Sequence, residues 1–331
     1  MEENNGSGSL LGKLFWILVV LAIICFSLVN YAVSSLQYEE TGVRYMVNSE
    51  ALYEDEDVRN ILIIGSDTRV SEQRGRADSV LLISVSEHNK TITVTSLMRD
   101  SYVEIPKYGW NKLNAAYAYG GASLLLDTVE ANFHIDVDEY FIVDFMAFIA
   151  IVDALGGVEI TMSDAEAAGV NDVLAAGLNE LVGDDRNADF LEQGGTLLLS
   201  GKQALAYSRL RYVGNADYER TQRQRKVFSA ITERVASFNP VGWFKLLRDA
   251  IPMLVTNMEE KTVMGWALEV PFLLTQYEMQ SLRMPAEGTY RNDMTTGGAA
   301  ILRVDFDENL TIFKDAVQNP IEEETQSSGG K

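Results

Sequence analysis

Residues 60–97 read NILIIGSDTRVSEQRGRADSVLLISVSEHNKTITVTSL, and this stretch decides the fold class. It begins with a short, continuous apolar run that ends at Gly65, a pattern typical of a strand buried on both faces. Two further strand patterns flank a polar turn at His88 to Lys90 and predict an antiparallel hairpin. The strands predicted by this stretch are 61–64, 79–86 and 91–97. A buried strand beside a hairpin indicates a mixed sheet.

The chain beyond this stretch alternates strand patterns with helical ones. Apolar residues at helical spacing predict helices at 114–131, 146–155, 200–208, 218–237, 241–256 and 261–275. Strand patterns occur at 139–145, 157–162, 278–284 and 300–306. This alternation predicts an α/β fold in which a mixed sheet core is flanked by helices on both faces, in αβα layers.

An apolar segment precedes the predicted fold. Leu14–Val33 contains 20 residues without a charge, and a helix of that length spans about 30 Å, the thickness of the hydrocarbon core of a bilayer. The apolar region of a signal peptide is usually shorter, and a buried helix of a globular core would normally show a polar stripe. We therefore predict one transmembrane helix. Lys13 before it and Glu39 and Glu40 after it favour a short N-terminus inside the cell and the remainder outside.

These patterns predict five regions. They are a short cytoplasmic N-terminus at 1–13, a transmembrane anchor at 14–33, a membrane-proximal stalk at 34–57, an extracellular folded domain at 58–318 and a polar, disordered tail at 319–331. The predicted location is thus a bacterial cell membrane, crossed once.

Composition excludes several classes of function. The 331 residues include 27 Lys and Arg against 48 Asp and Glu, a formal net charge of -21. This charge repels a polyanion, so we expect no nucleic-acid partner. One Cys excludes an intrachain disulfide, and two His with that Cys cannot complete a structural zinc site. Any metal is expected to have oxygen ligands.

One basic segment departs from this acidic composition. Residues 209–226 read RLRYVGNADYERTQRQRK and hold six of the 27 basic residues. Asp217, Arg220 and Gln224 share one face of the predicted helix. Arg209 and Arg211, two residues apart, would point the same way in an extended segment. Each guanidinium group can bind two phosphate oxygens at once, and several such groups together favour a diphosphate ligand. From this segment alone, a solvated surface helix remains the alternative.

Charged residues also gather at the ends of the predicted strands. Asp67 follows the first strand, Arg76 and Asp78 open the second, and Arg99 closes the third. Because the hairpin is antiparallel, these four side chains are expected to meet at one end of the sheet. Two carboxylates with several arginines fit Mg²⁺ holding a diphosphate. A single Asp in such a position is more often a turn or cap residue.

The sequence resembles the LytR-CpsA-Psr family over residues 58–232. The segments that carry the resemblance are NILIIGSDTR (60–69), GRADSVLLISV (75–85), SLMRDSYVEIP (96–106), NKLNAAYAYGG (111–121), VDALGGVEI (152–160), GKQALAYSRLRY (201–212) and DYERTQRQR (217–225). Met98 departs from the proline that commonly precedes the Arg-Asp pair in this family, and Lys112 lies within one matched segment.

The resemblance implies a membrane enzyme that moves an anionic glycopolymer, such as teichoic acid or capsule, from a polyprenyl-pyrophosphate carrier to peptidoglycan. Membrane lipid is a further implied partner, and Mg²⁺ the implied cofactor. Carried onto this chain, the metal ligands are Asp67 and Asp78. The residues implied to hold the pyrophosphate are Arg76, Arg99, Arg209, Arg211, Arg220 and Gln224, with Asp217 fixing the arginines. The implied catalytic residues are Asp67, Arg99 and Arg220, with Asp67 as the candidate for activating the acceptor hydroxyl.

Two alternatives stay open at this stage. The protein could be a polyprenyl-pyrophosphate hydrolase, or a lipid-binding envelope regulator without turnover. The apolar helices at 114–131, 146–155 and 241–275 fit either a tunnel for a polyprenyl tail or an ordinary close-packed core.

Overall fold

A seven-stranded mixed sheet forms the centre of the computed structural model, which describes residues 25–40, 42, 44, 52–67, 75–210, 216–236 and 240–319. The strand order is β1-β10-β7-β2-β3-β4-β11. The bounds of these strands are β1 Gln37–Tyr38, β2 Val58–Ser66, β3 Ala77–Ser86, β4 Thr91–Leu97, β7 Glu139–Val143, β10 Val255–Thr256 and β11 Glu278–Met284.

The predicted hairpin and mixed sheet are confirmed. β2 pairs antiparallel with β3, and β3 pairs antiparallel with β4, whereas β7 runs parallel to β2 on its other side. β11 runs parallel to β4 at one edge of the sheet. The pairing of β2 with β3 shifts register between Gly65 and Ser66, where the strand reaches the charged residues.

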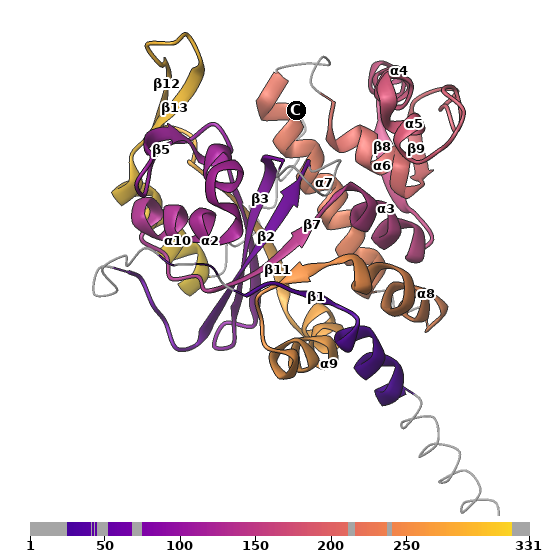
Figure 1. The fold of residues 1–331 in the computed structure, drawn as a ribbon, viewed down its shortest axis with the longest axis horizontal. Helices are drawn as coiled ribbons and strands as arrows, with labels where there is room; N and C mark the ends of the chain where they lie inside the picture. Colours follow the sequence, from indigo (N-terminus) through magenta and orange to yellow (C-terminus); the bar gives the residue numbers. More distant parts are fainter. Residues whose placement is uncertain are drawn as a thin grey trace, which may run out of the picture.

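Helices cover both faces of the sheet, as predicted. On one face, Leu62 and Ile64 of β2 pack in a core that includes Leu125 of α2 (Leu113–Phe133) and Phe313 of α10 (Phe306–Gln318). On the other face, Ile61 packs in a second core with residues of α3 (Phe145–Ala154), α7 (Ala216–Ala236) and α9 (Glu260–Gln276). Figure 1 shows α2 and α10 on one side of the sheet and α3 and α7 on the other.

A smaller lobe lies beside the sheet and has its own apolar core. It is built from α3 and α7 together with α4 (Asp164–Val173), the π-helical turn η2 (Leu174–Leu178), α5 (Asn179–Leu181), α6 (Gly201–Ser208) and the pair β8 (Val158–Met162) and β9 (Gly195–Leu199). α4 begins at a capping box in which Ser163 and Glu166 satisfy each other's backbone N–H groups. The sequence patterns predicted β8 and α6 but not α4 or β9.

Two hairpins project from the other side of the sheet. They are β5 (Tyr102–Ile105) with β6 (Gly109–Lys112), and β12 (Tyr290–Met294) with β13 (Ala300–Val304). An isolated bridge between Ser101 and Leu302 joins them. The first hairpin was not predicted, because its strands are only four residues long and its turn contains the left-handed residues Lys107 and Gly109.

The single helix predicted at 241–256 is wrong. The segment contains α8 (Pro240–Lys245), the π-helical turn η3 (Leu246–Ala250), the 3₁₀ turn η4 (Ile251–Met253) and then strand β10. Pro252 has no backbone N–H to continue the helix, and Val255 and Thr256 pair with β7 instead. The apolar side chains that suggested one helix here belong to four different elements.

The predicted transmembrane span falls mostly outside the described residues. Among the residues that are described, no helix is both long and apolar enough to cross a bilayer. Residues 25–34 are helical, and Val29, Ala32 and Val33 are buried. Val29 and Val33 belong to the same core as Ile61. Part of the predicted stalk is an edge strand, because β1 pairs with β10. The predicted tail lies outside the described residues except for residue 319.

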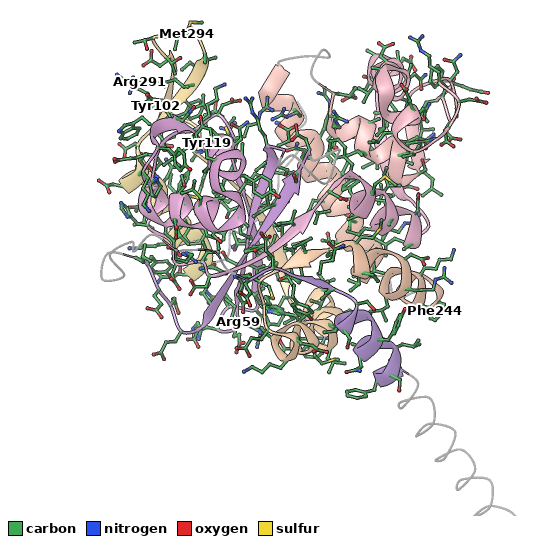
Figure 2. All side chains as sticks on the ribbon, viewed as in Figure 1. Arg59, Tyr102, Tyr119, Phe244, Arg291 and Met294 are labelled. Atoms are coloured by element: carbon green, nitrogen blue, oxygen red, sulfur yellow. The ribbon has the colours of Figure 1, made fainter. Side chains whose placement is uncertain are left out.

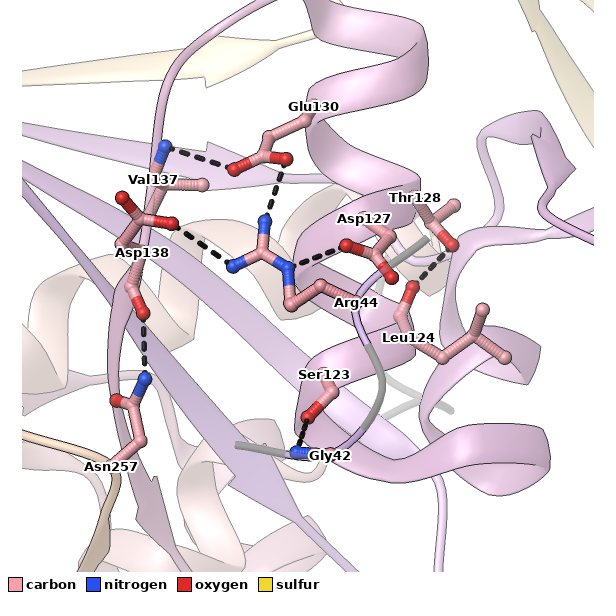
Figure 3. Close-up of polar contacts among 10 residues, drawn as sticks. All are labelled: Gly42, Arg44, Ser123, Leu124, Asp127, Thr128, Glu130, Val137, Asp138 and Asn257. Atoms are coloured by element: carbon pink, nitrogen blue, oxygen red, sulfur yellow. Dashed lines mark hydrogen bonds and ion pairs between the residues drawn. The ribbon is translucent and has the colours of Figure 1, made fainter. Parts of the chain in front are cut away.

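Arg44 attaches the segment before β2 to helix α2. Its guanidinium lies 2.6 Å from Glu130 Oε2 and 3.1 Å from Asp138 Oδ1, and its Nε also contacts the buried carboxylate of Asp127 (Figure 3). Burial raises the pKa of Glu130, and the hydrogen bond and charge of Arg44 oppose that rise. This pairing compensates the buried carboxylates, which would be costly without a cation.

Candidate active site

Asp67 and Asp78 stand at the adjacent ends of β2 and β3. The backbone N–H of Asp67 donates to the Arg76 carbonyl at 3.1 Å, and the Arg76 N–H donates back to Asp67 Oδ1. This reciprocal pair closes the base of the connection between the two strands. It holds the Asp67 carboxylate in place, whereas the Arg76 side chain is exposed.

Arg99 connects Asp78 to a second carboxylate. Its Nη1 lies 2.7 Å from Asp78 Oδ1, and its Nε lies 3.5 Å from Asp100 Oδ2. Lys112 Nζ lies 2.7 Å from Asp100 Oδ1. Charges of opposite sign thus alternate through Asp78, Arg99, Asp100 and Lys112. All four side chains are largely shielded from solvent, so the row fixes the orientation of Arg99 more firmly than exposed pairs would.

Helices α6 and α7 supply the remaining cations. Arg220 of α7 is only 4% exposed, and Gln224 lies one helical turn further on. Arg209 caps the C-terminus of α6, and its guanidinium carbon lies 4.5 Å from the centre of the Phe145 ring. Packing of a cation over an aromatic face is favourable and holds the Arg209 side chain.

These polar residues border a cavity of about 930 Å³ between the sheet and the smaller lobe. Asp67, Asp78, Arg209, Arg220 and Gln224 are all among its lining residues. The rest of the wall is mainly apolar and includes Ile63, Ile83, Phe141, Phe148, Val173 and Phe228. A second, much smaller hollow brings Arg99 beside Asp78, Arg220 and Gln224. This face of the sheet is therefore open rather than close-packed.

The structure brings together most of the site residues predicted from the sequence. Arg76 lines neither hollow, although its backbone holds Asp67. Arg211 and the side chain of Asp217 lie outside the part of the chain that the structure describes. Within the described part, no group of three or more His, Cys, Asp or Glu is arranged to hold a metal ion. Among the described residues, four carboxylates line the cavity: the predicted pair, Asp67 and Asp78, together with Asp144, which caps helix α3, and Glu180.

Sequence reasoning missed Arg223, which lies behind the cavity wall. It is 4% exposed, its Nε donates to Glu166 Oε1 at 2.9 Å, and its Nη1 donates to the Leu210 carbonyl at 3.4 Å. Burial disfavours the charged form of Glu166, but hydrogen bonds from Ser163 and Arg223 outweigh it, and the pKa of Glu166 is lowered. Arg223 thereby joins α7, α4 and the chain beside Arg209. The one feature of the sequence that could have indicated Arg223 is its position three residues after Arg220, which places the two side chains near each other on the helix.

The chain is similar in sequence and in fold to known proteins. The chain is 37% identical over 198 residues to the polyisoprenyl-teichoic acid–peptidoglycan teichoic acid transferase TagU of Enterococcus faecalis, an alignment that covers 58% of each protein. It is 30% identical over 241 residues to TagU of Halalkalibacterium halodurans, covering 72% of this chain and 73% of that one. The fold matches Bacillus subtilis YwtF (TagT) with bound octaprenyl pyrophosphate lipid with a TM-score of 0.58 and 27% identity, over 86% of this chain and 97% of that one.

The family model of LytR_cpsA_psr matches residues 25–313. That match includes strand β2, which is followed by Asp67, strand β3, which begins next to Asp78, the turn that carries Arg99, and helix α7 with Arg220. The helix and edge strand that precede β2 are also inside it. The resemblance seen in the sequence is confirmed, and the chain belongs to the LytR-CpsA-Psr family.

Proposed function

We propose that this protein is a membrane-anchored phosphotransferase that moves an anionic glycopolymer from a polyprenyl-pyrophosphate carrier to a peptidoglycan hydroxyl. Teichoic acid and capsule polymers are the substrate class. The observation that carries the proposal is one cavity whose lining is mainly apolar but also includes Asp67, Asp78, Arg209 and Arg220. The names of the two TagU relatives and the lipid bound to TagT support the same reading.

The two parts of the cavity suit the two parts of the donor. The apolar interior removes a polyprenyl tail from water, which is favourable in proportion to the area buried. At the mouth, Arg209 and Arg220 can bind phosphate oxygens, and Gln224 adds an amide donor. The apolar segment at 14–33 supports a single-pass anchor with the folded domain outside the cell, so that the donor enters from the adjacent membrane.

Mg²⁺ is part of this proposal. Asp67 and Asp78 would hold it, and they suit a cation that takes one or two carboxylates and completes its shell with phosphate oxygens and water. When bound, the ion would neutralise negative charge on the diphosphate. Because Arg99 contacts Asp78 in this structure, the same carboxylate also orients an arginine.

The reaction would be a phosphoryl transfer. The acceptor hydroxyl attacks the phosphorus that bears the glycan, and the bond to the bridging oxygen breaks, so that polyprenyl monophosphate leaves. Arg99 and Arg220 would stabilise the charge that develops on the phosphate oxygens. Asp67, held by the Arg76 backbone, is the candidate to accept the hydroxyl proton.

One experiment separates this activity from its alternatives. The full chain, with Mg²⁺ present, is incubated with lipid-linked glycopolymer, with and without peptidoglycan. A transferase forms a covalent polymer–peptidoglycan adduct only when the acceptor is present. Equal release of free polymer in both reactions would identify a hydrolase, and binding of the donor without consumption would identify a lipid-binding regulator.

A further inference from the structure

Two pairs of aromatic side chains lie next to the candidate active site but outside the cavity. They belong to the β5–β6 hairpin and the start of α2, and they are Tyr102, Tyr108, Trp110 and Tyr119. Trp110 is 52% exposed, and Tyr108 and Tyr119 are also exposed. Figure 2 shows Tyr102 and Tyr119 on the same side of the molecule, far from Phe244. A cluster of exposed rings on a protein surface commonly marks a binding site. We call these four residues the aromatic platform.

The hairpin holds the platform in a fixed conformation. Val103 and Ile105 are fully buried, so the alternate residues of β5 face outward. Tyr102 and Trp110 pack with ring centres 5.4 Å apart. Tyr108 and Tyr119 stack at 4.9 Å, and Asn111 donates to the Tyr119 hydroxyl at 2.8 Å. Because the rings are already ordered, a ligand would lose little affinity in immobilising them.

The platform continues directly into the charged row of the active site. Lys112 pairs with Tyr102 across the hairpin and lies on the same face of β6 as Trp110. Its Nζ contacts Asp100, whose neighbour Arg99 contacts Asp78 at the cavity mouth. None of the described residues that line the cavity comes from β5, β6 or α2. A molecule on the platform would therefore approach Arg99 from a different side than a lipid tail in the cavity.

The chemistry of the platform fits a chain of sugar rings. The face of an aromatic ring is slightly negative and attracts the weakly positive C–H groups on the flat side of a pyranose. Polar side chains lie among the rings: Glu104 is exposed opposite Trp110, and Arg303 lies 5.2 Å from the Tyr102 ring. These groups can bind hydroxyl and acetamido groups.

The charges favour a neutral glycan over an anionic one. Lys112 is paired with Asp100, and Arg303 is paired with Asp293, whose carboxylate also interacts with the charge of Arg291, so carboxylates balance part of the positive charge here. The exposed Glu104, which faces Trp110 across the hairpin, disfavours an anionic group at this surface. We propose that the aromatic platform binds the acceptor, a strand of N-acetylated hexosamines, by stacking sugar rings on Trp110 and its neighbours. This inference rests on the proposed function and names the acceptor side of the same site.

The test measures transfer by the full chain with soluble, uncrosslinked peptidoglycan strands as the acceptor. Trp110→Ala is expected to raise the KM for these strands about tenfold, with the KM for the lipid-linked donor unchanged. Trp110→Phe should recover most of the loss, because a ring face remains. Phe244→Ala removes another exposed aromatic ring, which is 42% exposed, and should change neither KM.

A second measurement separates failure of this inference from failure of the proposed function. Binding of the same strands to the protein without donor is followed by calorimetry, after circular dichroism has confirmed that each variant is folded. Weaker binding by Trp110→Ala supports the platform even if the wild type forms no adduct, which would count against the transferase alone. Unchanged binding and KM in the double variant Trp110→Ala/Tyr119→Ala would overturn the platform while leaving the transferase intact.

Discussion

Arg99 is the residue on which the two sides of the proposed reaction meet. It contacts Asp78 at the cavity mouth and Asp100 toward the aromatic platform. Arg99→Ala is expected to lower the transfer rate about 100-fold or more, because it removes a fixed cation from the charge that develops in the transition state. Adduct formation under saturating donor measures this effect.

The control for this prediction is Arg248→Ala. Arg248 is also paired with a carboxylate, Asp249, at 2.6 Å, but the pair is exposed on the surface. Its removal should leave the transfer rate unchanged. Near-normal transfer by Arg99→Ala, in a protein that still binds the lipid-linked donor, would contradict the assignment of Arg99.

At the same scale, the sequence predicted which side chains meet but not how they pair. Asp67, Asp78 and Arg99 flank strand ends, and the antiparallel hairpin brings such ends together by geometry alone. Arg220 and Gln224 share a helix face for the same kind of reason. The contact of Arg223 with Glu166, however, joins residues 57 positions apart. It depends on helix α4, which no pattern in the sequence predicted.

At the scale of elements, Glu166 and Arg223 position α7 against α4. The pKa of Glu166 is lowered, so its ionised form stabilises the fold above its unfolded pKa of about 4.5. That contribution is lost as the pH falls through the folded pKa. We predict that Glu166→Gln is less stable than the wild type near neutral pH, and that the difference shrinks below about pH 4.5.

Chemical unfolding at several pH values measures this difference. The same Glu166→Gln protein should show reduced transfer at neutral pH, because Arg220 and Gln224 are carried by α7. The role assigned to the ionised Glu166 would be contradicted if the difference in unfolding free energy between the wild type and Glu166→Gln stayed constant down to pH 3.

The Arg44 contact is a second link between elements. Arg44→Met leaves buried Asp127 and Glu130 without their cation, and we expect the free energy of unfolding to fall by about 2 kcal/mol at neutral pH. Because burial already raises the pKa of Glu130, protonation relieves part of this loss as the pH falls. The effect of the substitution should therefore be smaller near pH 4.5 than at pH 7.

The matched control is Lys261→Met, since Lys261 pairs with Glu259 at 2.6 Å but both side chains are exposed. It should leave the free energy of unfolding essentially unchanged at either pH. Equal effects of the two substitutions on chemical unfolding would refute the special role of the Arg44 contact.

Apart from the segment at 241–256, helices with a long periodic pattern were predicted within a few residues, whereas elements shaped by tertiary pairing were not. Helix α7 spans 216–236 against an expected 218–237, because its apolar and polar faces repeat over 21 residues. The two-residue strand β10 has no period of its own and exists because β7 and β1 pair with it. The β5–β6 hairpin is likewise defined by its packing on α2.

At the scale of the whole molecule, the cavity between the sheet and the smaller lobe is the main determinant of the proposed donor binding. Octaprenyl pyrophosphate at about 100 times its Kd should stabilise the protein by about 2.7 kcal/mol and so raise Tm by several degrees. Ala176→Trp places a large side chain at the η2 wall of the cavity and is expected to reduce this rise. Thermal unfolding with and without the lipid measures both effects.

Ala168→Trp provides the control, because Ala168 is exposed on α4 and does not line the cavity. It should leave the lipid-dependent rise in Tm intact. A full rise in Tm for Ala176→Trp as well would show that the lipid binds elsewhere.

Sequence patterns could not distinguish a cavity from a packed core, since apolar side chains at the same spacing occur in both.

The burial of Val29, Ala32 and Val33 within the fold also limits how the proposed anchor can be exchanged. These three residues lie in the predicted membrane span and in the described structure alike, so the two regions share side chains. A chimera that joined an unrelated spanning helix at residue 34 would leave apolar sheet residues such as Ile61 exposed to water. The functional unit for grafting onto another membrane protein therefore begins before Val29, not at the polar residues that follow the span.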